Sequence, residues 1–133
     1  MTSKVTYLGE LRTSSTHIQS GTEIISDAPT DNNGKGEAFS PTDTVANALA
    51  SCMMTVMGIK ARDLEVDLTN STAAVTKIMG TEPRRITEIH VKFEMSVAAD
   101  QRTRLILERT AMTCPVLNSL HPDIKKEVTF KWN

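Results

Sequence analysis

The segment from Val45 to Ile59 restricts the fold more than any other part of the chain, because as a helix it is apolar around most of its circumference. Its polar residues Asn47, Ser51 and Thr55 continue a four-residue spacing that starts at Asp43, so they form one narrow stripe. A helix of this kind has to be covered by protein on nearly all sides. In a chain of 133 residues a single sheet would cover it poorly, so we expect a partner subunit.

The start of this helix is marked by four residues, Ser40-Pro41-Thr42-Asp43. Ser40 suits the N-cap, Pro41 suits the first helical position, and the Asp43 carboxylate can reach back to the cap. The arrangement resembles a capping box with Asp in place of the usual Glu or Gln. We therefore interpret Asp43 as a capping residue.

The residues before the helix have the composition of strands and turns. Three short segments are predicted strands: Lys4–Leu8, Thr13–Gln19 and Thr22–Ser26. Gly9 and Ser20-Gly21 are the turns expected between them. The following segment, Asp27–Gly36, is the densest cluster of turn-forming residues in the chain and predicts an exposed loop.

The second half of the chain repeats the order of strands followed by helices. The expected elements are alternating stretches in Leu64–Met79, a long strand at Ile86–Val97, helices at Ala99–Met112 and Pro115–Leu120, and a last strand at Glu127–Trp132. No linker or repeat divides the chain, so residues 1–133 are predicted to be a single domain. This order of elements favours an α+β fold with antiparallel sheet.

Composition argues against several classes of protein. With 15 Lys and Arg against 16 Asp and Glu, the chain has no electrostatic footprint for nucleic acid. No segment approaches the run of about 18 uncharged apolar residues that a membrane span needs, and the N-terminus has no apolar signal segment. Two cysteines are too few for a disulfide scaffold. We expect a cytoplasmic protein with no cofactor and no membrane partner.

The two cysteines are the candidates for unusual chemistry. Cys52 lies in the middle of the apolar helix, where a free cysteine is commonly a buried and inert packing residue. Apolar surroundings raise the pKa of a thiol, so a reactive Cys52 would need a nearby cation. Cys114 precedes Pro115, where a helix restarts and its N–H groups could lower the pKa of the thiol. The alternative for Cys114 is a small residue in a tight corner.

Two motifs together resemble the OsmC/Ohr family of thiol-dependent peroxidases. The first runs from Ser40-Pro41-Thr42-Asp43 to Ala50-Ser51-Cys52, and the second is Thr113-Cys114-Pro115-Val116. The resemblance implies an OsmC-like fold, with antiparallel curved sheets packed around a central buried helix in an intertwined homodimer. Ohr-type members carry Glu where this chain has Thr42, so the similarity is to OsmC-like proteins outside the Ohr subgroup.

The resemblance also implies roles for individual residues. Cys52 matches the peroxidatic cysteine, which attacks an organic hydroperoxide and becomes a sulfenic acid, and Cys114 matches the resolving cysteine, which then forms a disulfide with it. An external dithiol reduces the disulfide, and in some relatives this reductant is a lipoyl-bearing protein. Arg12 matches an early-strand arginine that activates the thiolate. Glu37, in the loop before the helix, is our candidate for the carboxylate that orients Arg12.

Three other functions remain open at this stage. The first is a non-enzymatic dimeric protein that binds an apolar ligand and keeps its cysteines for packing. A metal site formed by Cys52, Cys114 and a histidine is disfavoured, because no pair has the short spacing of structural zinc sites. A nucleophilic hydrolase would need a histidine held beside a nucleophile. His90 is expected on the solvated face of its strand and His121 in a turn.

Overall fold

The computed structural model describes residues 1–133, which form two compact units, Met1–Val45 and Ala46–Asn133. The first unit contains an antiparallel sheet in the order β1-β2-β3. Its strands are β1 (Ser3–Gly9), β2 (Arg12–His17) and β3 (Glu23–Asp27). The three strands predicted in this part of the chain are therefore present, with small differences at their ends.

The loop after β3 folds back on itself. It contains one turn of 3₁₀-helix, η1 (Thr30–Asn32), and the Pro29 carbonyl accepts hydrogen bonds from the backbone N–H groups of Asn32 and Gly34. A Cβ atom at Gly34 would lie 1.7 Å from the carbonyl oxygen of Ala28, so only glycine fits there. The predicted loop is thus a compact segment with its own hydrogen bonds.

The long helix α1 (Pro41–Asp63) begins with the capping box that the sequence predicts. The backbone N–H of Ser40 donates to the Asp43 carboxylate at 3.0 Å, and the backbone N–H of Asp43 donates to the Ser40 hydroxyl at 3.0 Å. Each residue satisfies a backbone donor of the other. The interpretation of Asp43 as a capping residue is confirmed.

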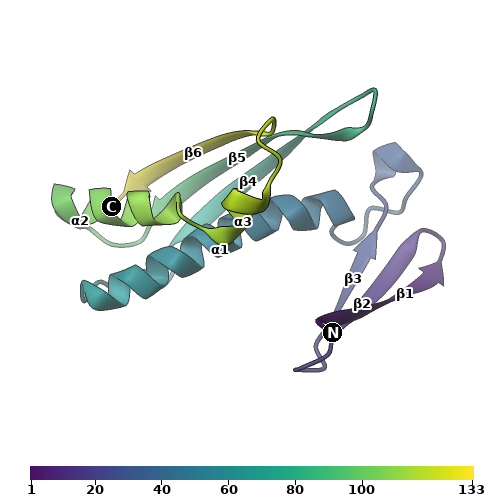
Figure 1. The fold of residues 1–133 in the computed structure, drawn as a ribbon, viewed down its shortest axis with the longest axis horizontal. Helices are drawn as coiled ribbons and strands as arrows, with labels where there is room; N and C mark the ends of the chain where they lie inside the picture. The colour runs from purple at the N-terminus through teal and green to yellow at the C-terminus, as the bar shows by residue number, and fades with distance from the viewer. The chain divides into compact units, whose positions relative to one another are not determined.

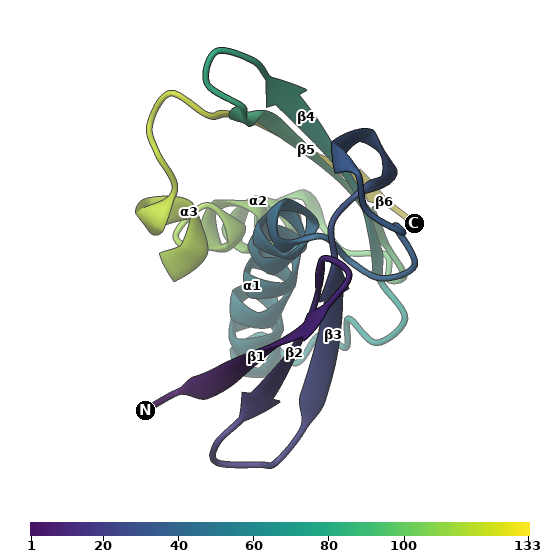
Figure 2. The same ribbon diagram turned by 90° about the vertical axis from the view of Figure 1, so that its right-hand side faces the viewer.

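The second unit is built on a three-stranded sheet in the order β4-β5-β6. Its elements after α1 are β4 (Thr72–Gly80), β5 (Arg85–Met95), α2 (Gln101–Ala111), α3 (Pro115–Ser119) and β6 (Lys125–Trp132). Figures 1 and 2 show α1 and α2 on the same face of this sheet. The predicted order of strands and helices is confirmed.

The strand β6 pairs in parallel with β5, whereas β4 and β5 are antiparallel. The prediction of wholly antiparallel sheets is therefore wrong for this strand. Two helices, α2 and α3, lie between β5 and β6 in the chain. A connection of this length can bring the chain back to the end of the sheet where β5 begins, as parallel pairing requires. A hairpin link could not have done so.

The hydrophobic core of the second unit lies between its sheet and its helices. One face of β5 is buried, with Ile89, Val91, Phe93 and Met95 all at 3% exposure or less. The other buried side chains of this cluster are Ala46, Leu49, Ala50, Met53, Met57 and Ala61 from α1, Leu107 and Ala111 from α2, and Cys114 at the start of α3. The alternation along β5 and the helical spacing along α1 place these side chains on facing surfaces.

The polar stripe predicted along α1 is exposed in this chain. Asn47, Ser51 and Thr55 are exposed, and so are the apolar residues Val45 and Ile59 near them. Within one chain, therefore, α1 is buried on one side. Cover on nearly all sides stays a prediction that depends on a partner subunit.

The helix α1 also has the length and apolar composition of a membrane-spanning helix. This differs from our expectation that no segment approaches such a span. The core helix of a folded domain meets the same criterion. The buried residues of α1 belong to the core of the second unit, which explains why its sequence is so apolar.

Candidate functional site

The two cysteines of the second unit come from neighbouring helices. Cys52 lies in the middle of α1 and is half-buried, and Cys114 is the buried N-cap residue of α3. Both are free thiols, and Cys52 packs against the core cluster that contains Cys114. The fold therefore brings together two sulfur atoms that are far apart in the sequence.

The N-cap position of Cys114 determines its hydrogen bonding. Its Sγ atom accepts a hydrogen bond from the backbone N–H of Leu117 at 3.2 Å, and Pro115 occupies the first helical turn. This is the helix restart that the sequence predicts after Cys114. The sulfur thus does what a Ser or Asp side chain does at an ordinary N-cap.

Burial raises the pKa of the Cys114 thiol above its ordinary value of 9.0. The backbone N–H groups of Leu117 and Val116 act in the opposite direction, and the neighbouring Cys52 side chain raises the pKa further. The N–H groups at the helix start do lower the pKa of Cys114, as expected, but desolvation outweighs them. At neutral pH Cys114 is protonated and able to donate a hydrogen bond.

Arg12, the predicted cation, lies on β2 in the first unit and pairs with Asp27. Its Nε atom donates to Oδ1 of Asp27 at 2.6 Å and its Nη2 atom donates to Oδ2 at 2.8 Å. The two residues are directly opposite each other in the β2–β3 register. This is the bidentate geometry in which guanidinium and carboxylate groups interact most strongly.

The Arg12–Asp27 pair changes the titration of both groups. The hydrogen bond from Arg12 holds the pKa of the Asp27 carboxyl below its ordinary value of 3.8, against the opposing effect of burial. The hydrogen bond to Asp27 likewise raises the pKa of Arg12. Both groups are therefore charged at neutral pH.

Glu37, the predicted carboxylate partner of Arg12, is also in contact with it. Oε2 of Glu37 lies 3.3 Å from Nη2 of Arg12, and the Glu37 side chain is 66% exposed. Asp27, at 1% exposure, makes the shorter contacts. Sequence reasoning missed Asp27, which we had assigned to the turn cluster. The one signal for it is its place at the end of β3, and only the strand register reveals that this end faces Arg12.

The predicted site residues therefore form two groups. Cys52 and Cys114 belong to the second unit, whereas Arg12, Glu37 and the added Asp27 belong to the first. The activation of Cys52 by Arg12 stays a prediction. The described residues contain no cluster of three or more His, Cys, Asp or Glu side chains arranged to hold a metal ion.

The two histidines considered above, and Arg85, have local roles. His90 is not freely solvated, because its Nε2 atom lies 3.2 Å from Glu88 and 3.3 Å from Glu127 on the outer face of the sheet. His121 is exposed in a turn, as predicted. Arg85 donates from Nη1 to the carbonyls of Thr81 and Pro83 and so supports the turn between β4 and β5.

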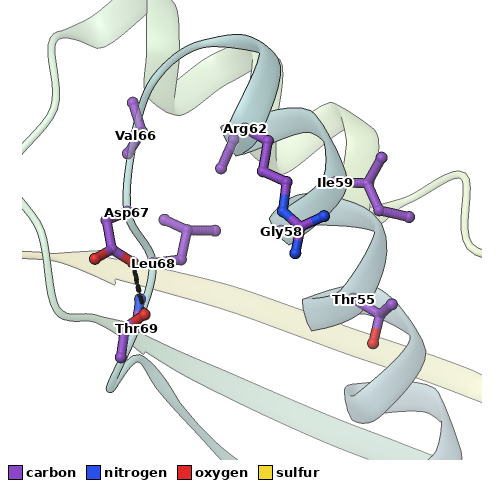
Figure 3. Close-up of a pocket in the computed structure, with 9 residues that line it drawn as sticks. Thr55, Gly58, Ile59, Arg62, Val66, Asp67, Leu68 and Thr69 are labelled. Carbon is purple, nitrogen blue, oxygen red and sulfur yellow. Dashed lines mark hydrogen bonds between the residues drawn. The ribbon is translucent and has the colours of Figure 1, made fainter.

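A shallow cavity of about 310 Å³ lies at the C-terminal half of α1, and neither cysteine lines it. Figure 3 shows Thr55, Ile59 and Arg62 on the helix side and the loop residues Leu68 and Thr69 opposite them. The Asp67 carboxylate in this loop accepts hydrogen bonds from the backbone and hydroxyl of Thr69. This cavity is therefore separate from the cysteine pair.

Comparisons with known proteins agree on one family. The sequence model for the OsmC-like protein family matches residues 34–129. A crystal structure from Psychrobacter arcticus 273-4, provisionally described as an osmotic stress induced and detoxification response protein, is 56% identical with a TM-score of 0.96. The alignment covers 98% of this chain and 96% of that one. A comparison with curated protein sequences gives no match.

More distant structures share the fold. The organic hydroperoxide resistance protein OsmC from Legionella pneumophila is 14% identical with a TM-score of 0.76, over 98% of this chain and 97% of that one. A Vibrio cholerae protein, provisionally described as an organic hydroperoxide resistance protein with captopril bound in one of its active sites, is 17% identical. Its TM-score is 0.74, over 98% of this chain and 91% of that one.

Proposed function

Because the chain belongs to the OsmC family, we propose that it is a thiol-dependent peroxidase that reduces organic hydroperoxides in defence against oxidative stress. The observation that carries the proposal is the pair of free cysteines, one from α1 and one at the start of α3, which meet in the core of the second unit, where Cys52 packs against the cluster that contains Cys114. The names of related proteins, which include organic hydroperoxide resistance proteins, support the same class of substrate.

The proposed cycle has three steps. The Cys52 thiolate attacks one oxygen of the hydroperoxide, so an S–O bond forms, the O–O bond breaks, and the alkoxide takes a proton and leaves as an alcohol. The Cys114 sulfur then attacks the Cys52 sulfenic acid, which forms the S–S bond and releases water. An external dithiol, for which a lipoyl-bearing protein is one candidate, exchanges with the disulfide and becomes oxidised itself.

Cys114 is suited to the second step because it stays a thiol until it is needed. Its raised pKa keeps the proton on Cys114 while Cys52 reacts first. We assign Cys52 to the first step because it is the more exposed of the two. Arg12 is the proposed source of positive charge beside the Cys52 thiolate.

We also propose that the protein is a homodimer. All the large apolar side chains of Met1–Val45 are exposed: Met1, Val5, Tyr7, Leu8, Leu11, Ile18, Ile24, Ile25, Phe39 and Val45. Exposed apolar residues at this density mark a surface that is covered in the assembled protein. A second copy of the chain is the proposed cover, in keeping with the stripe of α1 that one chain leaves exposed.

We place the protein in the reducing cytoplasm, where both thiols stay available.

The experiment that tests this function measures consumption of tert-butyl hydroperoxide with dithiothreitol as the dithiol. We expect Cys52→Ser to lower the rate at least about a hundredfold, because the remaining thiol, Cys114, is buried and protonated and is a poor nucleophile for the O–O bond. Ser51→Ala, next to it on the exposed stripe, is the matched control and should retain the wild-type rate. Activity that survives in Cys52→Ser would refute the proposal and favour a protein that only binds apolar ligands.

Mass spectrometry separates the two cysteines. After one equivalent of hydroperoxide the wild type should lose two hydrogens and both alkylatable thiols, because the disulfide has formed. Cys114→Ser should instead stop at the Cys52 sulfenic acid, which dimedone traps. Two free thiols in the treated wild type would contradict the mechanism.

A further inference from the structure

We propose that Asp27 is the residue that positions Arg12 for reaction at Cys52, and that Glu37 is secondary. This inference rests on the proposed function, because it assigns a task to Arg12 in the first chemical step. Asp27 is a positioning residue in it: its carboxylate acts through Arg12. The observations that carry it all lie within the first unit, Met1–Val45.

The first observation is the edge of the guanidinium that Asp27 occupies. Asp27 accepts from Nε and Nη2 of Arg12, which together form one edge of the planar group. Nη2 also contacts Glu37, whereas Nη1 makes no hydrogen bond with another residue of the first unit. The Arg12 side chain is 30% exposed, so this nitrogen is not sealed off. Asp27 therefore fixes the plane of the guanidinium and leaves two N–H donors for a thiolate or a peroxide oxygen.

The second observation is how firmly the Asp27 carboxylate is itself held. Besides the two donors of Arg12, its Oδ2 atom accepts from the backbone N–H of Glu37 at 3.1 Å. The backbone N–H of Asp27 donates to the carbonyl of Phe39 at 3.1 Å. Asp27 thus joins the end of β3 to both Glu37 and Phe39 in the segment before α1. A carboxylate that is buried and held by three donors has little freedom to release Arg12.

The third observation is the contrast with Glu37. The Glu37 carboxylate is mostly exposed and has one contact of 3.3 Å with Arg12. Solvent screens an exposed pair of this kind, so it contributes little to orientation. Thr42 occupies the position after Pro41 where a carboxylate is expected from the resemblance to Ohr-type proteins. Asp27, at the end of β3, supplies a carboxylate in its place.

The consequence for the reaction is preorganisation. A guanidinium that is already oriented stabilises developing negative charge without reorganising when the O–O bond breaks. The charge of Asp27 does not move during the reaction and no bond to Asp27 forms or breaks. Removal of Asp27 should therefore slow the step at Cys52 and leave the later attack by Cys114 unchanged.

The test compares Asp27→Asn with the matched control Glu37→Gln, since both replace a carboxylate by the amide of the same size. Stopped-flow measurements with tert-butyl hydroperoxide follow the formation of the sulfenic acid and then of the disulfide. We expect Asp27→Asn to lower the bimolecular rate constant of the first step at least about tenfold. The rate of disulfide formation should stay within about twofold, and Glu37→Gln should change the first step by less than about threefold.

A second pair of variants keeps the test valid if Asp27→Asn folds poorly. Asp27→Ala leaves space for a small carboxylate, so added formate should restore the rate of the first step in proportion to its concentration. The same formate should have no effect on Glu37→Ala or on the wild type. A rescue of this kind requires a folded protein and an empty carboxylate position beside Arg12.

The outcomes separate this inference from the function on which it rests. An inactive wild type would overturn the proposed function and this inference together. If the wild type is active, three results would overturn the inference alone. In the first, Asp27→Asn forms the sulfenic acid as fast as the wild type. In the second, Glu37→Gln is the slower variant, and in the third, Asp27→Asn slows both steps equally. Equal slowing of both steps would mean that Asp27 is needed only for the fold.

Discussion

The two units of this protein differ in whether their apolar side chains are buried or exposed. In Ala46–Asn133 the apolar side chains of α1, α2 and β5 face one another and form a closed core. In Met1–Val45 every large apolar side chain is exposed, and the two buried residues, Asp27 and Ser40, are polar. One unit completes its core within the chain and the other does not.

This difference explains where each part of the candidate site obtains its rigidity. The cysteine pair is held by packing, since Cys114 belongs to the hydrophobic core and Cys52 packs against it. Arg12 is held by hydrogen bonds, through the Asp27 carboxylate and the β2–β3 register. Substitutions that change side-chain volume should therefore affect mainly the second unit. Substitutions that change charge or disturb association should affect mainly the first unit.

The largest effect is expected from a cavity in the second unit. Phe93 is 1% exposed, and its ring stacks on Phe130 with 5.0 Å between the centroids. Phe93→Ala should lower the free energy of unfolding by about 3–5 kcal/mol, measured by urea denaturation. Thr129→Ala, on an exposed position of β6, serves as the control. A loss below about 1 kcal/mol at Phe93 would mean that the core is not closed within this unit.

A smaller effect is expected when a charge enters the apolar surface of the first unit. Val5, Tyr7 and Ile24 lie on one face of its sheet, because Val5 and Ile24 both align with Ser15 and Tyr7 lies two residues from Val5. If a second copy covers this face, Val5→Lys should weaken dimerisation by about 2 kcal/mol or more, which analytical ultracentrifugation detects as dissociation.

The matched control for that change is Thr129→Lys on the exposed face of the other sheet. It should leave the oligomeric state unchanged. A wild type that is monomeric at all concentrations, or a dimer that Val5→Lys does not weaken, would remove the proposed explanation for the exposed apolar residues.

The smallest effect is expected in the acid dependence of stability. Since the folded-state pKa of Asp27 lies below the ordinary value of 3.8, its contribution is present above that value and lost as pH falls through the folded pKa. The stability difference between the wild type and Asp27→Asn should therefore be constant near neutral pH and shrink as the pH is lowered past 3.8. Urea denaturation at a series of pH values measures it. A difference that grows on acidification would contradict the lowered pKa.

The identity and order of the elements could be derived from the sequence, because the signals for them are local. The capping box at Ser40 and Asp43 involves residues three positions apart, and the alternation in β5 is visible within the strand itself. The interruption of the helical pattern at Pro115 likewise marks the start of α3. Each of these features depends on backbone geometry over a few residues, which the sequence specifies directly.

The tertiary structure decided the features that depend on distant residues. The parallel pairing of β6 with β5 depends on the path that α2 and α3 take, and hairpin-based reasoning predicted it wrongly. The pairing of Arg12 with Asp27 depends on strand register, and the raised pKa of Cys114 depends on burial among other elements. The sequence by itself determined which segments are strands and helices, and it supplied the candidates for the chemistry. The partner of Arg12 and the protonation state of Cys114 followed only from the fold. Strand register and desolvation are set by atoms that are remote in the chain.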